Sequence, residues 1–209
     1  MIAKRKSRYY NALMDNKNNS FRIVTPRLIL KEMTEADFGS LCLMLYDEKV
    51  MYAYAHTFSE SEAREWLDRQ IARYRRYGFG LWGMFLRENG KMIGQCGITM
   101  QNIGEKEVPE IGYLLNSDFF GYGYATEGAK YCKRYGFDNL GFDAIYSIIR
   151  DNNLPSQAVA RRNGMTPCGE LVKHYYGIDM PHIIFRITRE EYVGQKPKRD
   201  EKQLPTTDK

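Results

Sequence analysis

The segment "DFFGYGYATEG", residues 118–128, constrains the fold of this chain more than any other stretch. An apolar strand-like run, "VPEIGYLL", ends just before it, and a helical pattern begins near Ala125. The first turn of a helix has backbone N–H groups without internal partners, and the helix dipole makes that end positive. Gly121 and Gly123 keep bulky side chains away from those groups. The pattern therefore predicts a strand-to-helix corner that binds phosphate through main-chain amides.

The corner does not match two other phosphate-binding motifs. A P-loop would end in Gly-Lys-Ser/Thr, and a Rossmann fingerprint would need a third glycine and a position early in the chain; the segment has none of these. A glycine-rich turn without any ligand explains a bare G-x-G-x-A equally well, so this alternative stays open on the motif alone.

Hydrophobic periodicity predicts the elements around the corner. Their order is a strand, two helices, three strands, a helix, a strand, a helix and two strands. Thr34 and Ser59 are expected to cap the first two helices, because each stands three residues before an acid. "MTPCGELVKHYYG" and "MPHIIFRITREEYV" are expected to finish the fold as an antiparallel pair. This order indicates an α+β (mixed α/β) domain around one sheet, with about four flanking helices.

Length and charge limit the domain organisation. The chain has 209 residues, enough for one domain with tails. We expect a polar, basic extension over residues 1–20, a folded domain over 21–193 and a disordered tail over 194–209. The net charge of +5 lies largely in the two tails, and solvated basic tails are common, so we expect no nucleic-acid partner.

The cysteines and the hydropathy pattern bear on the compartment. No apolar run approaches the length of a membrane span, about 18 residues, and the N-terminal segment lacks the apolar stretch of a secretory signal. The cysteines form no C-x-x-C pair, and we interpret them as buried free thiols; they are Cys42, Cys96, Cys132 and Cys168. These features favour a cytoplasmic protein without a membrane partner or a bound metal.

Four segments of the chain resemble a known family. "PEIGYLL", "FFGYGYATEGA" and "NLPSQAVARRNGM" occur in the order and spacing of the GNAT superfamily of N-acetyltransferases, and "VTPRLILKEMTEADF" is similar to the start of its ribosomal-protein N-terminal acetyltransferase branch. The resemblance covers residues 21–193. It implies a mostly antiparallel twisted sheet that is splayed between two parallel strands, with acetyl-CoA as cosubstrate.

The resemblance also implies which residues bind acetyl-CoA. The family signature Q/R-x-x-G-x-G/A falls on residues 120–125, and Phe120 departs from its Gln/Arg position. The pantetheine arm is expected to bond to the backbone of Tyr113, Leu114 and Leu115, and Asn153 is expected to hold it further along. The full set of implied cofactor-binding residues is Tyr113, Leu114, Leu115, Phe120, Gly121, Tyr122, Gly123, Tyr124, Ala125, Thr126, Asn153 and Ser156.

Acetyl transfer needs a neutral amine and a proton for the leaving thiolate. Glu110, on the first splayed strand, is the candidate base, directly or through a water. A carboxylate that orients the substrate or caps the sheet is an equal alternative. Ser156 is the candidate donor to the sulfur, with Tyr175 and Tyr176 as rivals.

The acceptor is less defined than the donor. The expected function is acetyl transfer to a primary amine, either a protein N-terminus or a small molecule. "VMYAYAHTFSE" is a candidate lining of the acceptor site, although core packing is a slightly better explanation of its aromatic residues. A noncatalytic CoA-binding or RNA-associated module is the alternative function. The oligomeric state is open, a homodimer included.

Overall fold

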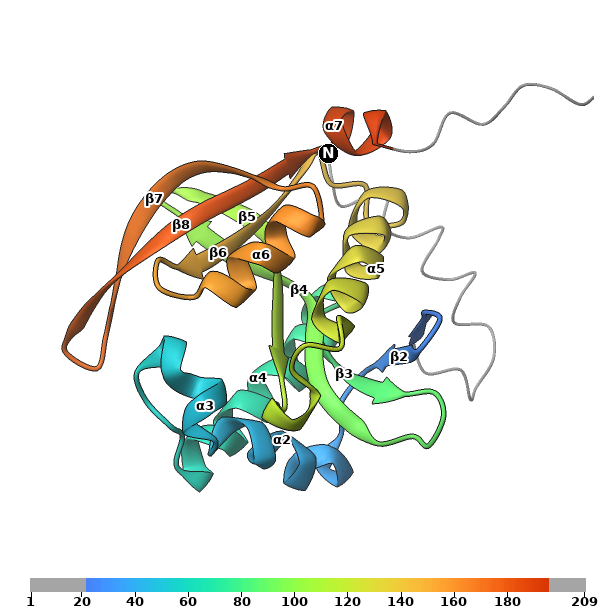
Figure 1. Ribbon diagram of the computed structural model, residues 1–209, viewed down its shortest axis with the longest axis vertical. Helices are drawn as coiled ribbons and strands as arrows, with labels where there is room; N and C mark the ends of the chain where they lie inside the picture. The colour runs from blue at the N-terminus through green and yellow to red at the C-terminus, as the bar shows by residue number, and fades with distance from the viewer. Residues whose placement is uncertain (1–21, 196–209) are drawn as a thin grey trace, which may run out of the picture.

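One mixed sheet organises the computed structural model, which describes residues 22–195 (Figure 1). Within that range eight strands pair in the order β1-β2-β3-β4-β5-β6-β8-β7. Neighbouring strands run antiparallel except β5 and β6, which run parallel. The predicted mixed α/β class and mostly antiparallel sheet are confirmed. The expected extension over residues 1–20 and the tail beyond residue 195 lie outside the described residues.

The elements have the following bounds. The strands are β1 (Arg22–Val24), β2 (Leu28–Lys31), β3 (Leu81–Leu86), β4 (Met92–Ile103), β5 (Lys106–Leu115), β6 (Ala144–Arg150), β7 (Thr166–Tyr175) and β8 (Ile178–Thr188). The helices are α2 (Phe38–Leu45), α3 (Glu48–Met51), α4 (Glu60–Tyr77), α5 (Tyr124–Asp138), α6 (Leu154–Arg162) and α7 (Arg189–Gly194), with 3-10 turns η1 (Glu35–Asp37), η2 (Tyr52–Tyr54) and η3 (Ser117–Phe119).

Local sequence signals start and stop several of these elements. Thr34 forms the predicted capping box with Asp37, but it caps η1, and α2 begins at Phe38. Ser59 caps α4: its hydroxyl accepts the Glu62 N–H, and the Glu62 carboxylate accepts the Ser59 N–H at 2.7 Å. Gly78 ends the helix in the left-handed conformation, with a φ of 75°, which glycine adopts at little cost. A turn at Asn89 and Gly90 joins β3 to β4, as an Asn-Gly pair between two apolar runs indicates.

Two predicted elements differ from the structure. The first strand of the predicted order is a hairpin, in which β1 pairs antiparallel with β2, because Thr25 donates its backbone N–H to the Leu28 carbonyl and closes a turn. The last predicted strand ends at Thr188 instead of continuing to Val193. Thr188 forms a capping box with Glu191 and starts α7.

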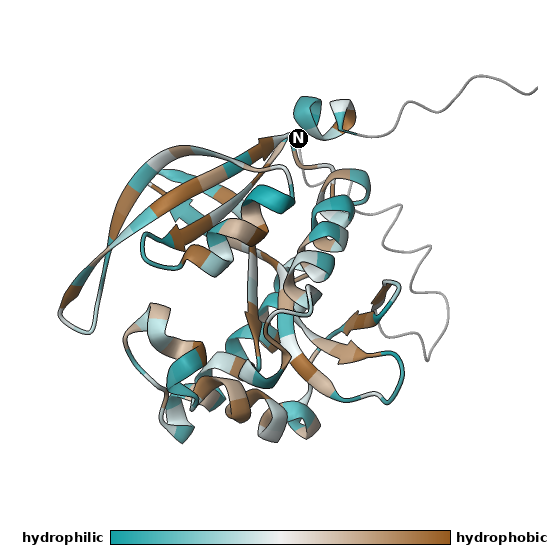
Figure 2. Ribbon diagram, in the orientation of Figure 1, coloured by the Kyte–Doolittle hydropathy of each residue, from teal (hydrophilic) through white to brown (hydrophobic). Residues whose placement is uncertain are grey.

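The helices cover both faces of the sheet. Buried side chains of α5 and α6 pack with one face, and those of α2 and α4 form a second cluster on the other. Hydrophobic residues recur along β8 and α2 (Figure 2). Three cysteines are buried as predicted, but Cys168 is exposed, because it lies on the edge strand β7. Among the described residues, no helix is both long enough and apolar enough to cross a bilayer.

Candidate active site

The glycine corner joins β5 to α5 through η3. Gly121 and Gly123 both have a positive φ, 83° and 80°, a conformation that strains other residues. α5 begins at Tyr124, one residue earlier than predicted, with Gly123 as its N-cap and no side-chain cap. Its first intrahelical bond runs from the Glu127 N–H to the Gly123 carbonyl at 3.0 Å. The amides of the preceding first-turn residues therefore have no helical partner, as an anion site requires.

The side chains around the corner leave it open to solvent. A Cβ built on Gly121 would meet no atom within 4 Å among the described residues. Phe120 is 48% exposed and Tyr122 is 64% exposed, so neither side chain is packed into the core at this corner. The rings of Tyr122 and Tyr124 stack with their centroids 6.1 Å apart. The corner therefore has the open geometry that amide contacts from residues 120–126 need, and those contacts stay a prediction.

Strands β5 and β6 share a single registered pair, Glu110 and Tyr146. β5 then continues to Leu115 with partners only on its β4 side, which is the geometry expected of splayed strands. The Ser147 hydroxyl donates to the Ile111 carbonyl at 2.8 Å and closes the narrow end of the gap.

The gap widens from Ser147 toward α6. The Tyr113 hydroxyl crosses it and donates to the Ser156 carbonyl at 2.6 Å. Backbone groups of Tyr113, Leu114 and Leu115 that point toward β6 meet no registered strand there. An extended amide-bearing arm could bond to these groups as a substitute strand. The prediction that pantetheine does so is compatible with this geometry.

Glu110 lies at the closed end of the gap. Its carboxylate accepts the Ile148 N–H from β6 at 3.0 Å, so it helps to hold the two parallel strands together. Burial raises the pKa of Glu110, and the positive charge of Lys173, the Ile148 N–H and Arg73 oppose that rise. A carboxyl group with a raised pKa is suited to accept a proton near neutral pH.

Sequence patterns did not identify the groups around Glu110. Lys173 comes from β7 and Arg73 from α4, and both influence the carboxylate electrostatically. Tyr54, from η2, is close enough that the charge of Glu110 adds to the effect of burial in raising the pKa of its hydroxyl. η2 and α4 are near one another in sequence, but β5 and β7 lie far from them and from each other, so only the folded topology brings these groups together.

Aromatic residues from the segment after α3 lie close to Glu110. Tyr54 contacts Phe58 and Trp66 edge to face, with ring centroids 6.5 Å and 6.3 Å apart. The His56 ring lies 4.1 Å from that of Tyr176, which sits in the turn between β7 and β8. "VMYAYAHTFSE" thus packs against the α2–α4 cluster and also meets the β7–β8 turn near Glu110.

Asn153 and Ser156 open α6. The Asn153 side-chain oxygen caps the helix by accepting the Ser156 N–H at 3.1 Å, and it also accepts the Tyr52 hydroxyl at 2.8 Å. Both contacts use the oxygen, so the amide nitrogen of Asn153 is the group that could hold pantetheine. The Ser156 side chain is half-buried, and the backbone carbonyl of Ser156 accepts the Tyr113 hydroxyl. The structure thus brings both predicted residues to the wide end of the gap.

The histidines have ordinary partners. His56 contacts Glu62 at 2.9 Å, and His174 contacts Asp179 at 2.8 Å on the exposed hairpin. His182 is buried, and its Nδ1 lies 2.7 Å from the Met180 carbonyl.

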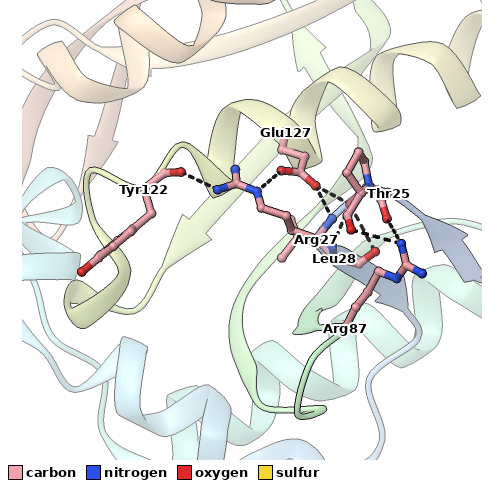
Figure 3. A network of polar contacts seen from close by, with 7 residues as sticks. Thr25, Arg27, Leu28, Arg87, Tyr122 and Glu127 are labelled. Atoms are coloured by element: carbon pink, nitrogen blue, oxygen red, sulfur yellow. Dashed lines mark hydrogen bonds and ion pairs between the residues drawn. The ribbon is translucent and has the colours of Figure 1, made fainter.

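A basic residue that sequence reasoning missed lies against the corner. Arg27, in the turn between β1 and β2, contacts Glu127 on the first turn of α5 and the carbonyl of Tyr122 (Figure 3). Arg27 lies in the segment that resembles the start of the family, but no sequence pattern indicates its contact with Glu127, 100 residues later.

Comparison with known proteins decides the family. The acetyltransferase (GNAT) domain profile matches residues 27–166. The chain belongs to the GNAT acetyltransferase family. The GNAT assignment makes it an acyltransferase, and the family uses acetyl-CoA. The sequence resemblance is therefore confirmed.

Individual GNAT relatives are moderately similar. The uncharacterized protein YkkB of Bacillus subtilis is 34% identical over 149 residues, which cover 71% of this chain and 87% of that protein. The FsC-acetyl coenzyme A-N(2)-transacetylase of Aspergillus fumigatus is 30% identical over 163 residues, covering 70% and 67%. The structure of RimL, a ribosomal L7/L12 alpha-N-protein acetyltransferase in complex with coenzyme A, has the same fold, with a TM-score of 0.64, 22% identity, and coverage of 79% and 96%.

Proposed function

We propose that this protein transfers the acetyl group of acetyl-CoA to a primary amine by direct attack on the thioester. The observation that carries this proposal is the position of Glu110. Its carboxylate, with a raised pKa, lies at the closed end of the gap between β5 and β6. Asn153 and Ser156 lie at the other end of the same gap, which the Tyr113 contact spans. A base and a thioester-binding surface would thus share one cleft.

The glycine corner supplies the other end of the donor site in this proposal. Coenzyme A would place its diphosphate on the amides of residues 120–126 and its pantetheine arm along Tyr113, Leu114 and Leu115. Phe120 replaces the polar residue common at its position, so main-chain groups carry more of the binding. Charged hydrogen bonds of this kind contribute about 1.5–3 kcal/mol each.

Electrostatics around Glu110 bear on the acceptor. At pH 7, deprotonating an α-amine costs about 1 kcal/mol and deprotonating a lysine about 4.6 kcal/mol, from their reference pKa values. Arg73 and Lys173 near Glu110 would lower the pKa of an amine bound there. We therefore propose an amine of low pKa, such as a protein N-terminus or a small-molecule amine. RimL is named as an acetyltransferase of a protein alpha-amine, and the FsC transacetylase is named for acetyl transfer to an N(2) nitrogen.

The leaving thiolate needs a proton. Ser156 stays our first candidate, because it lies at the wide end of the gap. Tyr175 and Tyr176 are the rivals, and they are 46% and 53% exposed on the β7–β8 hairpin. Free cysteines at all four positions fit the proposed cytoplasmic location, because reducing compartments keep thiols unpaired.

Thiol release from acetyl-CoA in the presence of an amine library tests this function. Acetylated products are identified by mass spectrometry across N-terminal peptides and small amines. Turnover with at least one acceptor class supports the proposal. Coenzyme A binding without turnover across every acceptor would instead support a noncatalytic CoA-binding module.

A further inference from the structure

The turn between β1 and β2 is fastened to the first turn of α5 through one carboxylate. Glu127 Oε1 accepts the Thr25 hydroxyl at 2.6 Å and the Arg27 backbone N–H at 2.9 Å, and its Oε2 accepts Arg27 Nε at 2.6 Å (Figure 3). Charge-assisted bonds of this length are the strong ones. A single acid on α5 thus holds three donors from a segment about 100 residues earlier.

The same guanidinium reaches past Glu127 to the glycine corner. Arg27 Nη1 donates to the Tyr122 carbonyl at 3.0 Å, and the guanidinium lies 4.4 Å from the centre of the Tyr124 ring. A Cβ on Gly123 would be 3.7 Å from Arg27 Nη2. Because a trans peptide is planar, a Tyr122 carbonyl held by Arg27 turns the Gly123 N–H to the opposite side. Arg27 therefore fixes the direction of an amide at the corner.

The ion pair between Arg27 and Glu127 also neutralises charge next to the glycine corner. An acid in the first turn of a helix that binds diphosphate would repel the ligand unless it were neutralised. Burial alone would raise the pKa of Glu127, but the hydrogen bonds from Thr25 and Arg27 outweigh burial and lower it. Glu127 is therefore ionised, and its pairing with Arg27 removes the net charge. Arg27 is 47% exposed, whereas Glu127 is only 12% exposed.

Arg87 also stabilises the turn that carries Arg27. Arg87 Nη1 donates to the Thr25 carbonyl at 3.1 Å and to the Pro26 carbonyl at 3.0 Å (Figure 3). The Thr25 hydroxyl accepts the Leu28 N–H at 2.8 Å. A guanidinium carried on a rigid turn loses less freedom when it holds a loop, so its hydrogen bonds orient that loop more effectively.

We propose that Arg27 and Glu127 are positioning residues for coenzyme A, which orient the Tyr122–Gly123 peptide and neutralise the helix end where the diphosphate binds. This inference rests on the proposed function, because it needs the diphosphate at the glycine corner. In this proposal the network affects binding of the diphosphate part of coenzyme A and has no effect on binding of the pantetheine part. A purely structural role for Arg27 and Glu127 would affect both parts equally.

Calorimetry with coenzyme A and with pantetheine, which lacks the diphosphate and the nucleotide, tests the inference. Arg27→Gln is expected to weaken coenzyme A binding about tenfold, because it releases the Tyr122 carbonyl and leaves the charge of Glu127 without its partner. Pantetheine binding is expected to change less than about twofold. Arg27→Lys keeps the charge but lacks the fork that holds Glu127 and the Tyr122 carbonyl together, so it is expected to weaken coenzyme A binding in the same direction.

Arg134→Gln is the matched control, because Arg134 forms an exposed ion pair with Asp138 near the other end of α5. It is expected to leave the binding of both ligands unchanged. Equal losses for coenzyme A and pantetheine in the Arg27 variants, or no loss for either, would overturn the inference. Wild-type protein that binds no coenzyme A would instead refute the proposed function, and with it the premise of this inference. Thermal unfolding of each variant shows whether a loss of binding reflects a loss of folded protein.

Discussion

Glu110→Gln is the substitution that most directly tests the proposed chemistry. Glutamine has the same shape, and its side-chain oxygen can still accept the Ile148 N–H that Glu110 accepts at 3.0 Å. The parallel strands should therefore stay in register while the base is lost. General-base groups contribute about 10²–10⁴ in rate. For an α-amine acceptor, whose deprotonation costs about 1 kcal/mol, we expect the lower end, a fall in kcat of about 10².

The same substitution should raise stability. Burial outweighs the attraction of Lys173 and Arg73 and raises the folded pKa of Glu110 above its unfolded value. The contribution of Glu110 to stability is then fully present below the unfolded pKa and is lost as the pH rises through the folded pKa. Glutamine carries no charge at any of these pH values. Glu110→Gln is therefore expected to melt at a higher temperature than wild type at pH 7, with the difference shrinking as the pH falls.

The assay is thiol release at saturating acetyl-CoA over a range of pH, combined with thermal unfolding at the same pH values. Wild-type kcat should rise with pH through the raised pKa of Glu110, and the variant should lack that rise. Glu107→Gln is the control, because Glu107 is an exposed acid on the same strand. A kcat for Glu110→Gln within about threefold of wild type would refute the role of base, since even a weak general base exceeds that. Glu110 would then be a residue that joins β5 to β6.

Three further predictions concern the donor site. Gly123→Ala should lower the free energy of unfolding in urea by about 1–2 kcal/mol, because alanine is strained at a φ of 80°; an unchanged value would mean that the corner adopts another conformation. Ser156→Ala should lower kcat if the hydroxyl protonates the sulfur, and a rise in KM alone would assign it to binding. Tyr113→Phe should destabilise the protein by about 0.5–1.5 kcal/mol in the same unfolding assay, because the hydrogen bond from its hydroxyl to the Ser156 carbonyl is lost; full stability would show that water replaces the hydroxyl.

The parts of this protein that sequence could predict are those whose physical cause is local. Caps such as Ser59 and turns such as Asn89-Gly90 depend on residues within one turn of chain, and both were located correctly. The glycine corner is of the same kind, since a positive φ and an uncapped helix end follow from adjacent residues. Thr188 and Glu191 also give a local signal for helix α7. The prediction missed this helix because it continued the apolar alternation of β8 through residues 189–193.

The proposed donor and acceptor sites differ in how far the sequence could predict them. A diphosphate is held largely by main-chain groups, so its site needs permissive residues at fixed spacing, and a short motif records that spacing. The surroundings of Glu110 are built by side chains from α4, β7 and η2, whose meeting depends on the order of strands in the sheet. No spacing rule links Arg73 to Lys173, because 100 residues of strand and helix separate them.

Backbone strain occurs at two turns on the proposed acceptor side. Ala55 and Tyr176 are the non-glycine residues with positive φ in the described part of the chain, and both have a φ of 52°. They come from segments far apart in sequence, yet they lie next to each other through the ring contact of His56 with Tyr176. Strain of this kind persists only where the surrounding structure enforces it, and it gathers at ligand-binding sites. If the acceptor binds between these two turns, Ala55→Gly and Tyr176→Gly should each stabilise the backbone while weakening discrimination among acceptor amines, as measured by kcat/KM across the library. Unchanged discrimination in both variants would place the acceptor elsewhere along the cleft.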